Sequence, residues 1–136
     1  MSSSAPSTFP DVEALVVDLL SDLPELAGAI VDDEPPAGFD GTQRAVIVSR
    51  RGGAWIDDLH LDQPLIELEV YGPTKSAAHI LANQARAVVL NSAGTVLGTS
   101  VITDVSEADG PRWLPDYLYT AANRYLCVLR LSVRTD

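Results

Sequence analysis

The chain has 136 residues, of which 46% are hydrophobic and 21% charged, as expected for one globular domain. Its net charge is −10, and no apolar run approaches the roughly 18 residues of a membrane helix. The acidic net charge excludes tight nucleic-acid binding, which needs clustered Lys and Arg. The lack of a long apolar run excludes a membrane span. The acidic residues are concentrated, because residues 1–43 contain nine of them and no Lys or Arg. This part must face water, a basic partner or something anionic that it repels.

The N-terminus predicts a short flexible segment, residues 1–8, followed by a single domain over residues 9–136. Residues 2–7 are rich in Ser and Pro, and the chain does not begin with a basic region followed by an apolar stretch, so we expect no secretory signal. Cys127 is the single cysteine and lies in an apolar run. It cannot form a disulfide within the chain, and its neighbours favour the role of a small buried hydrophobe.

The first regular element is predicted to be an amphipathic helix that ends near Pro24. Pro10 suits a first helical turn, and Thr8 with Asp11 forms a possible capping box. The apolar face comprises Val12, Leu15, Val16, Leu19, Leu20 and Leu23. A neighbouring acidic stripe comprises Asp11, Asp18, Asp22 and Glu25. The spacings of 3 and 4 residues are those of one helical face.

Strand-like runs dominate the middle of the chain. Residues 26–31 could pair as a short strand, and residues 32–42, with two Pro and two Gly, predict a loop. Residues 45–51 read as a strand that Gly52-Gly53 turns, and residues 54–61 as a short strand or wide hairpin tip. Residues 65–71 alternate, with Ile66, Leu68 and Val70 on one side and Glu67, Glu69 and Tyr71 on the other.

The second half predicts one helix and three more strands. Thr74 caps an Ala-rich helix over residues 75–93, with Ala77, Leu81, Ala85 and Val88 on its inner face. Strands are expected over residues 96–97, 101–105 and 122–133. The longest one places Tyr125, Cys127, Leu129, Leu131 and Val133 on one face.

Residues 109–119 are predicted to form a rigid aromatic loop. Pro111 and Pro115 fix the backbone on either side of Arg112, Trp113 and Leu114, which therefore suit neither a helix nor a central strand. Trp and Arg are enriched where one protein anchors on another, so this loop is a candidate contact surface. The alternative is that Trp113 folds back onto the edge of its own core.

The order of helix, strands, helix and strands predicts an α+β domain. We expect a mainly antiparallel sheet with two α-helices packed on one face. The uncovered face then needs polar residues or another subunit.

The sequence contains no coherent active site. Asp58, His60 and Asp62 would share one face of an extended segment and could bind a divalent metal that activates water, although a solvated turn is the favoured interpretation. No nucleophile elbow and no phosphate-cradling glycine loop is present. We therefore expect no cofactor and no catalytic residues. Arg50 and Arg51 could hold an anion, but more simply they blunt the end of a strand.

Several short motifs in order resemble the tail terminator (tail completion) proteins of long-tailed double-stranded-DNA bacteriophages. These motifs cover the chain from Phe9 to Val133. They are Phe9-Pro10-Asp11-Val12-Glu13, Gly52-Gly53-Ala54-Trp55, Asp62-Gln63-Pro64, Val70-Tyr71-Gly72-Pro73-Thr74, Gly110-Pro111-Arg112-Trp113-Leu114-Pro115-Asp116 and the run from Arg124-Tyr125 to Val133.

The resemblance implies a non-enzymatic virion protein, assembled in the host cytoplasm. It would form a ring, usually a hexamer, that caps the head-proximal end of the tail tube and stops its polymerisation. Its partners would be copies of itself, the tail tube protein and a head-completion or neck protein, while DNA passes through without specific binding. Alternatives are a head-closure or tail-tube component, and a small metal-dependent hydrolase.

Two kinds of surface fit that role. Head-to-tail contacts in a ring need different patches on two sides of each subunit. The candidates are the uncovered sheet face with Pro111, Arg112, Trp113, Leu114 and Pro115, and the loop around Phe39. The acidic stripe of Asp11, Asp18, Asp22 and Glu25 would either line the lumen and repel phosphate or form a solvated helix face.

Overall fold

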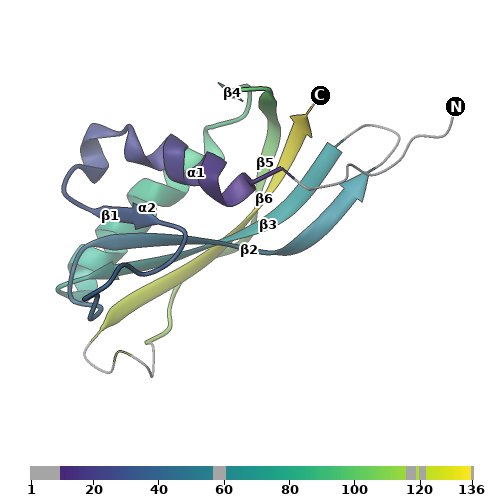
Figure 1. The fold of residues 1–136 in the computed structure, drawn as a ribbon. Coiled ribbons are helices and arrows are strands. Elements are labelled where there is room, and N and C mark those ends of the chain that lie inside the picture. Colours follow the sequence, from purple (N-terminus) through teal and green to yellow (C-terminus); the bar gives the residue numbers. More distant parts are fainter. Residues whose placement is uncertain (1–9, 57–60, 116–118, 120–121, 136) are drawn as a thin grey trace, which may run out of the picture.

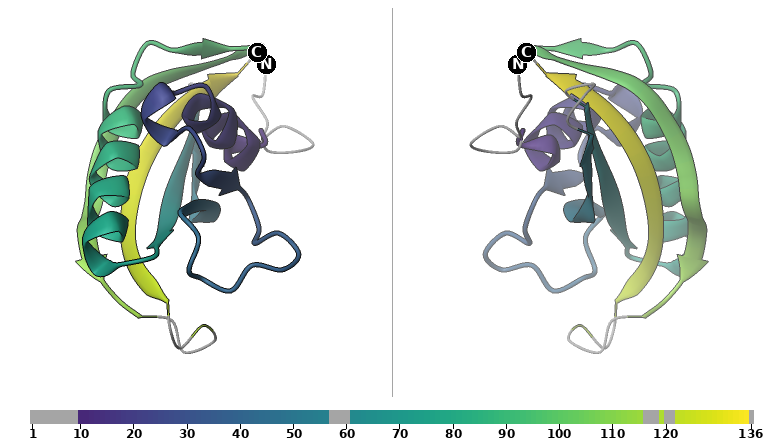
Figure 2. Two further views of the ribbon diagram at one scale, coloured as in Figure 1. Left: turned by 90° about the vertical axis from the view of Figure 1, so that its left-hand side faces the viewer. Right: turned by 90° about the vertical axis from the view of Figure 1, so that its right-hand side faces the viewer.

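The computed structural model describes residues 10–56, 61–115, 119 and 122–135. They form one six-stranded sheet with two α-helices packed on one face (Figures 1 and 2). The elements in chain order are α1 (Val12–Ser21), the 3-10 turn η1 (Pro24–Leu26), β1 (Ile30–Asp32), β2 (Ala45–Ile56), β3 (Leu61–Gly72), α2 (Lys75–Leu90), β4 (Val96–Leu97), β5 (Ser100–Trp113) and β6 (Asn123–Thr135).

The strand order is β1-β2-β3-β6-β5-β4. Only β1 pairs parallel to its neighbour, and every other adjacent pair is antiparallel. The left view of Figure 2 shows both helices in front of the sheet, and the right view shows β5 and β6 in front of the helices. The predicted α+β class, with helices on one face of a mainly antiparallel sheet, is confirmed.

Helix α1 begins one turn later than the predicted capping box. Its N-cap is Asp11, whose Oδ1 accepts a hydrogen bond from the backbone N–H of Ala14 at 3.0 Å. The alternative cap, Thr8, lies outside the described residues. The helix ends at Ser21, and its buried residues all come from the predicted apolar face. They are Val12, Leu15, Val16 and Leu20.

Helix α2 has the predicted cap and lies close against the sheet. Thr74 Oγ1 accepts a hydrogen bond from the backbone N–H of Ala77 at 3.0 Å. The helix ends at Leu90, three residues earlier than expected. Its buried face is Ala78, Leu81, Ala82, Ala85 and Val89, so the predicted inner residues Ala77 and Val88 are only half-buried. The helix lies so close to the sheet that a Cβ at Gly72 would lie 2.6 Å from the Ala78 nitrogen. The small side chains on this face permit the close approach.

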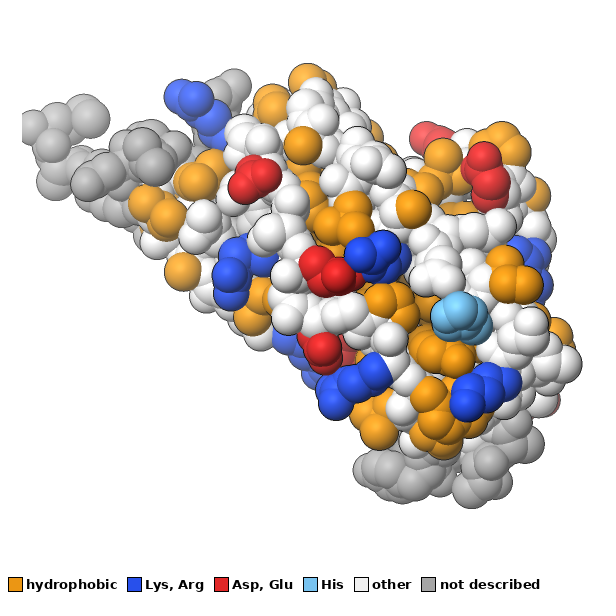
Figure 3. Space-filling model, turned by 180° about the vertical axis from the view of Figure 1, so that it is seen from behind, with side chains coloured by type: hydrophobic (Ala, Val, Ile, Leu, Met, Phe, Trp, Pro, Cys, Tyr) orange, Lys and Arg blue, Asp and Glu red, His pale blue; other side chains and the backbone are white. Residues whose placement is uncertain are grey.

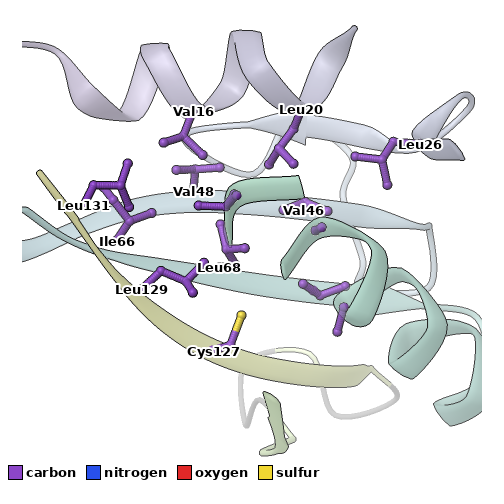
Figure 4. Packing of buried hydrophobic residues seen from close by; sticks show 14 of the residues in the cluster. Val16, Leu20, Leu26, Val46, Val48, Ile66, Leu68, Cys127, Leu129 and Leu131 are labelled. Carbon is purple, nitrogen blue, oxygen red and sulfur yellow. The ribbon is translucent and has the colours of Figure 1, made fainter. Parts of the chain in front are cut away.

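The main core lies between the helices and the inner face of the sheet (Figure 4). Val16 and Leu20 of α1 face Val46 and Val48 of β2, while Cys127 lies deeper along β6. All five residues predicted for the inner face of the last strand are buried: Tyr125, Cys127, Leu129, Leu131 and Val133. An ion pair between Arg86 of α2 and Glu107 of β5 fastens the helix to the outer part of the sheet.

The turn predicted at Gly52-Gly53 is wrong. Gly52-Gly53 does not reverse the chain but forms a bulge, where the register of β2 shifts and Gly53 has a φ of +111°. Pairing resumes from Gly53 with Pro64 to Ile56 with Leu61, so the segment 62–64 belongs to β3. A glycine bulge bends a strand without ending it. The hairpin is therefore longer than the glycines suggested.

The predicted loop at 109–119 is also wrong up to Trp113, because β5 continues through it. Pro111 lies at a register shift between Asp109 and Arg112. A proline lacks an N–H and is tolerated at such a bulge near a sheet edge. Strand β4 pairs only with Ser100 and Val101, so no described strand covers the outer edge of β5 from Thr103 onward.

Candidate assembly surfaces

The uncovered face of the sheet is covered at one end by the chain's own loop and carries charged, polar and half-buried apolar side chains elsewhere. On β2, β3 and β6, the residues that alternate with the core residues point outward from this uncovered face. At one end, Phe39 from the loop after β1 packs on Tyr71 with ring centroids 4.9 Å apart and on Tyr119 at 5.4 Å. Ala45, Ile47 and Ala122 complete this second hydrophobic cluster.

Phe39 was predicted to contribute to a partner contact, but the structure places it in the subunit's own core. Its side chain is 9% exposed. The loop lies so close to Ala122 that a Cβ at Gly41 would lie 2.6 Å from Ala122 Cβ. The loop therefore covers one end of the sheet and leaves its backbone, its polar side chains and the exposed Pro35 and Ala37 for a partner.

Ion pairs cross the middle of the uncovered face. Arg51 Nε donates to Glu67 Oε2 at 2.5 Å, and Arg124 Nη1 donates to Glu69 Oε2 at 2.9 Å. The Tyr71 hydroxyl donates to the same Glu69 oxygen at 3.2 Å. The alternation of residues 65–71 predicted that both glutamates face away from the core. The alternation gave no indication of their arginine partners, which lie on other strands.

The predicted patch from Pro111 to Pro115 is divided between two faces. Trp113 packs toward the helices, with its ring centroid 5.6 Å from that of Tyr125 and with Lys75 Nζ 4.6 Å above it. Arg112 pairs across the strand with Leu126, whose side chain belongs to the uncovered face, and its guanidinium lies 3.3 Å from Asp109. The half-buried Trp113 thus follows the alternative in which it packs at the edge of its own core.

An apolar strip remains exposed beside Trp113. His79 stacks near Tyr125 with ring centroids 5.3 Å apart, Ile80 is 55% exposed, and Leu114 is 40% exposed. Figure 3 shows hydrophobic side chains beside a histidine, with lysine and arginine side chains at their border. His79, Ile80 and Trp113 lie on the helix side of the sheet, whereas Leu114 follows Trp113, hydrogen-bonds through its backbone N–H to Arg124, and by alternation lies on the side of Arg112.

The acidic stripe is on the surface, as predicted. Asp11, Asp18, Asp22 and Glu25 are all exposed, and within the part of the chain that the structure describes none of them forms an ion pair. Asp11 serves as the helix cap. Asp22 is the C-cap of α1, where its backbone N–H donates to Leu20 O.

Of the three candidate metal ligands, only Asp62 lies in the described residues. Asp62 is fully buried, and both its oxygens accept hydrogen bonds from Arg50, at 2.6 and 2.7 Å. Asp58 and His60 lie outside the described residues. Among those that are described, no group of three His, Cys, Asp or Glu could hold a metal ion.

Cys127 is not a reactive thiol. Burial raises its pKa to about 12, so the nucleophilic thiolate is strongly disfavoured near neutral pH. None of the helices in the described ranges is both long enough and apolar enough to cross a membrane.

Comparison with known proteins identifies a family and a fold. The family model described as "Phage tail termination protein" matches residues 8–120. Among solved structures, the chain is similar to one from "Virion of native gene transfer agent (GTA) particle", with 15% identity and a TM-score of 0.63 over 90% of this chain and 93% of that one. At this identity the likeness concerns the fold. No curated protein matches the sequence.

Proposed function

Because the chain belongs to the phage tail termination protein family, we propose that it closes the head-proximal end of a tail tube as a ring. It is a structural protein of a bacteriophage virion, and the match over residues 8–120 is the observation that carries this conclusion. The proposed ring contains six copies of the chain. The ring ends tube polymerisation and presents a second surface to a head-completion or neck protein.

The shape and surfaces of the subunit support assembly by docking. The helices cover one face of the sheet, so the two sides of the subunit differ in chemistry. A closed ring with head-to-tail contacts needs such different patches. The apolar strip of Ile80 and Trp113 adds a third surface, which suits the tail tube or the neck.

The proposed role is not catalytic. Asp62 is engaged by Arg50, and Cys127 is buried, so neither supplies a metal ligand or a nucleophile. The subunit carries nine acidic residues before its first basic one, Arg44. A surface of this sign does not hold DNA phosphates, and DNA would pass through the ring without being bound.

A tube-capping experiment tests the proposal. Purified protein is added to polymerising tail tube subunits, and the tube ends are viewed by electron microscopy. We expect a ring of protein at one end of each tube and tubes that stop growing. Protein incorporated along the whole tube would identify a tube component instead, and binding only to heads would identify a head-closure protein.

A metal measurement tests the hydrolase alternative in the same preparation. We expect no stoichiometric zinc or manganese, and we expect the His60→Ala variant to cap tubes as the unchanged protein does. A bound ion that is lost together with assembly in His60→Ala would contradict the non-enzymatic role.

A further inference from the structure

Two arginines on the uncovered sheet face lack the partners that their neighbours have. Arg130 and Arg134 of β6 are exposed, and neither forms an ion pair within the described ranges. They lie four residues apart on one strand and therefore on the same face. Arg51 and Arg124, on that face as well, are each bound to a glutamate. Asp104 of β5 is exposed on the same face, opposite Ser132 and therefore between the two arginines. The end of the face opposite Phe39 thus carries two arginines and one carboxylate, a surplus of one positive charge.

The same face has an apolar centre. Leu65 of β3 pairs with Arg130, and Leu126 and Val128 of β6 pair with Glu69 and Glu67. All three apolar side chains are half-buried in the isolated subunit. An apolar centre bordered by charged groups is the usual anatomy of a protein interface. The chain's own loop does not reach this part, since its cluster ends at Tyr71 and Ala122.

The complementary charge is present on the opposite side of the same subunit. The outer surface of α1 and η1 carries Asp18, Asp22 and Glu25, exposed and without ion-pair partners among the residues described. The helices and the uncovered face lie on opposite sides of the sheet (Figure 2). The subunit therefore presents an unpaired acidic surface on one side and an unpaired basic pair on the other.

We infer that the uncovered sheet face, around Arg130 and Arg134, docks on the acidic surface of α1 from a second copy of this chain. This assignment rests on the proposed ring and names its subunit contact. A second copy is favoured over another protein because both halves of the charge pairing belong to this chain, on different sides, as a head-to-tail contact requires. The α1 carboxylates then lie between subunits instead of lining the lumen.

Charge reversal on each side separately, and then on both, tests the contact. The variants are Arg130→Glu with Arg134→Glu, Asp18→Lys with Asp22→Lys, and all four together. Asp33→Lys with Glu34→Lys is the control, because both residues are exposed and acidic but lie outside α1. Self-association is measured by sedimentation velocity over a concentration series at low salt, and tube capping by electron microscopy.

We expect each reversal to weaken self-association by at least about tenfold, since like charges then face each other. The four-residue variant should return to within about threefold of the unchanged protein, and the control should not differ from it. Circular dichroism confirms that each variant is folded.

Two outcomes separate the contact from the proposed function. If the unchanged protein assembles and the arginine variant assembles equally well, or if the four-residue variant remains as weak as its parents, the contact is wrong and the ring stands. If the unchanged protein stays monomeric alone and on tail tubes, both the ring and the contact are wrong.

Discussion

At the scale of single residues, the buried charge lies where α1 meets the β2–β3 hairpin. Asp62 is fully buried, and its carboxylate accepts two hydrogen bonds from Arg50. The backbone N–H of Arg50 donates to Glu13 Oε2 of α1 at 2.8 Å. Helix and hairpin are therefore joined through one arginine. Burying a charge is tolerable only while this pairing is complete.

Removing one partner of this pair should destabilise the subunit strongly. We expect Asp62→Ala to lower the free energy of unfolding by about 3 kcal/mol, because Arg50 then loses its carboxylate partner at a largely buried site. Asp109→Ala is the matched control, since its pair with Arg112 is exposed, and it should cost less than about 1 kcal/mol. Urea denaturation measures both. Equal losses would mean that burial does not determine the effect.

The buried thiol gives a prediction for alkaline pH. Burial raises the pKa of Cys127 to about 12, whereas an unfolded chain exposes a thiol with a pKa near 9. The unfolded state therefore releases a proton first, and stability due to this group should fall as pH rises from about 9 toward 12. Denaturation of the unchanged protein and of Cys127→Ala across this range isolates the effect. Parallel curves would contradict it.

Trp113 combines packing at the core edge with partial exposure. Trp113→Ala removes the contacts with Tyr125 and Lys75, and we expect a loss of about 2 kcal/mol with the fold retained. The variant should also cap tubes less well, because the apolar strip beside Ile80 is interrupted. Near-ultraviolet circular dichroism and the capping assay measure the two effects. A globally unfolded variant would show that Trp113 belongs to the core alone.

At the scale of elements, the hairpin depends on one glycine of the two at its bulge. Gly52 and Gly53 both have positive φ, at +94° and +111°. A Cβ at Gly53 would lie 2.1 Å from the carbonyl oxygen of Gln63, whereas a Cβ at Gly52 would meet nothing within 4 Å. Backbone strain is common to both positions, but the collision with β3 is specific to Gly53.

Alanine substitutions should distinguish these two glycines. Gly52→Ala should cost about 1 kcal/mol, the strain of a positive φ in a residue with a side chain. Gly53→Ala should cost at least about 3 kcal/mol, because β2 must move away from β3 at the bulge. Thermal and urea denaturation measure the difference. Similar losses for both variants would mean that the hairpin can relax around Gly53.

The elements that the sequence predicts well are those with a local periodic signal. The apolar face of α1, the Thr74 cap of α2 and the alternation from Leu65 to Tyr71 depend on spacing within one segment, and the structure confirms them. Glycine and proline are ambiguous signals for the end of a strand, because both also occur in bulges that continue a strand. Whether Gly52-Gly53 or Pro111 ends a strand depends on pairing with distant strands.

The candidate surfaces show the same division between local and distant information. Exposure of Asp18 and Asp22 followed from helical spacing. The burial of Phe39 did not, since its partners Tyr71 and Tyr119 are far along the chain. The pairing of Asp62 with Arg50 was hidden for the same reason. The register of β2 and β3 brings Arg50 and Asp62 together, and the sequence does not predict that register across the glycine bulge.

At the scale of the whole molecule, charge is distributed so that subunit stability and assembly oppose each other. Asp18 of α1 and the C-cap residue Asp22 lie four residues apart, a spacing at which like charges destabilise a helix. Their cost in the free subunit is offset once basic groups approach. In the proposed ring, those groups are Arg130 and Arg134 of the neighbour. The same carboxylates therefore weaken the monomer and strengthen the assembly.

Salt should consequently act in opposite directions on the two states. Raising NaCl from about 0.02 to about 0.5 M shortens the screening length from roughly 20 Å to a few ångströms. We expect the dilute subunit to unfold at a higher temperature, because repulsion along α1 is screened. Self-association should weaken over the same range, because the contact between subunits is screened as well. Calorimetry of dilute protein and sedimentation of concentrated protein measure the two trends. Association that strengthens with salt would point to a contact dominated by apolar surface, such as the strip at Ile80, in place of the charged one.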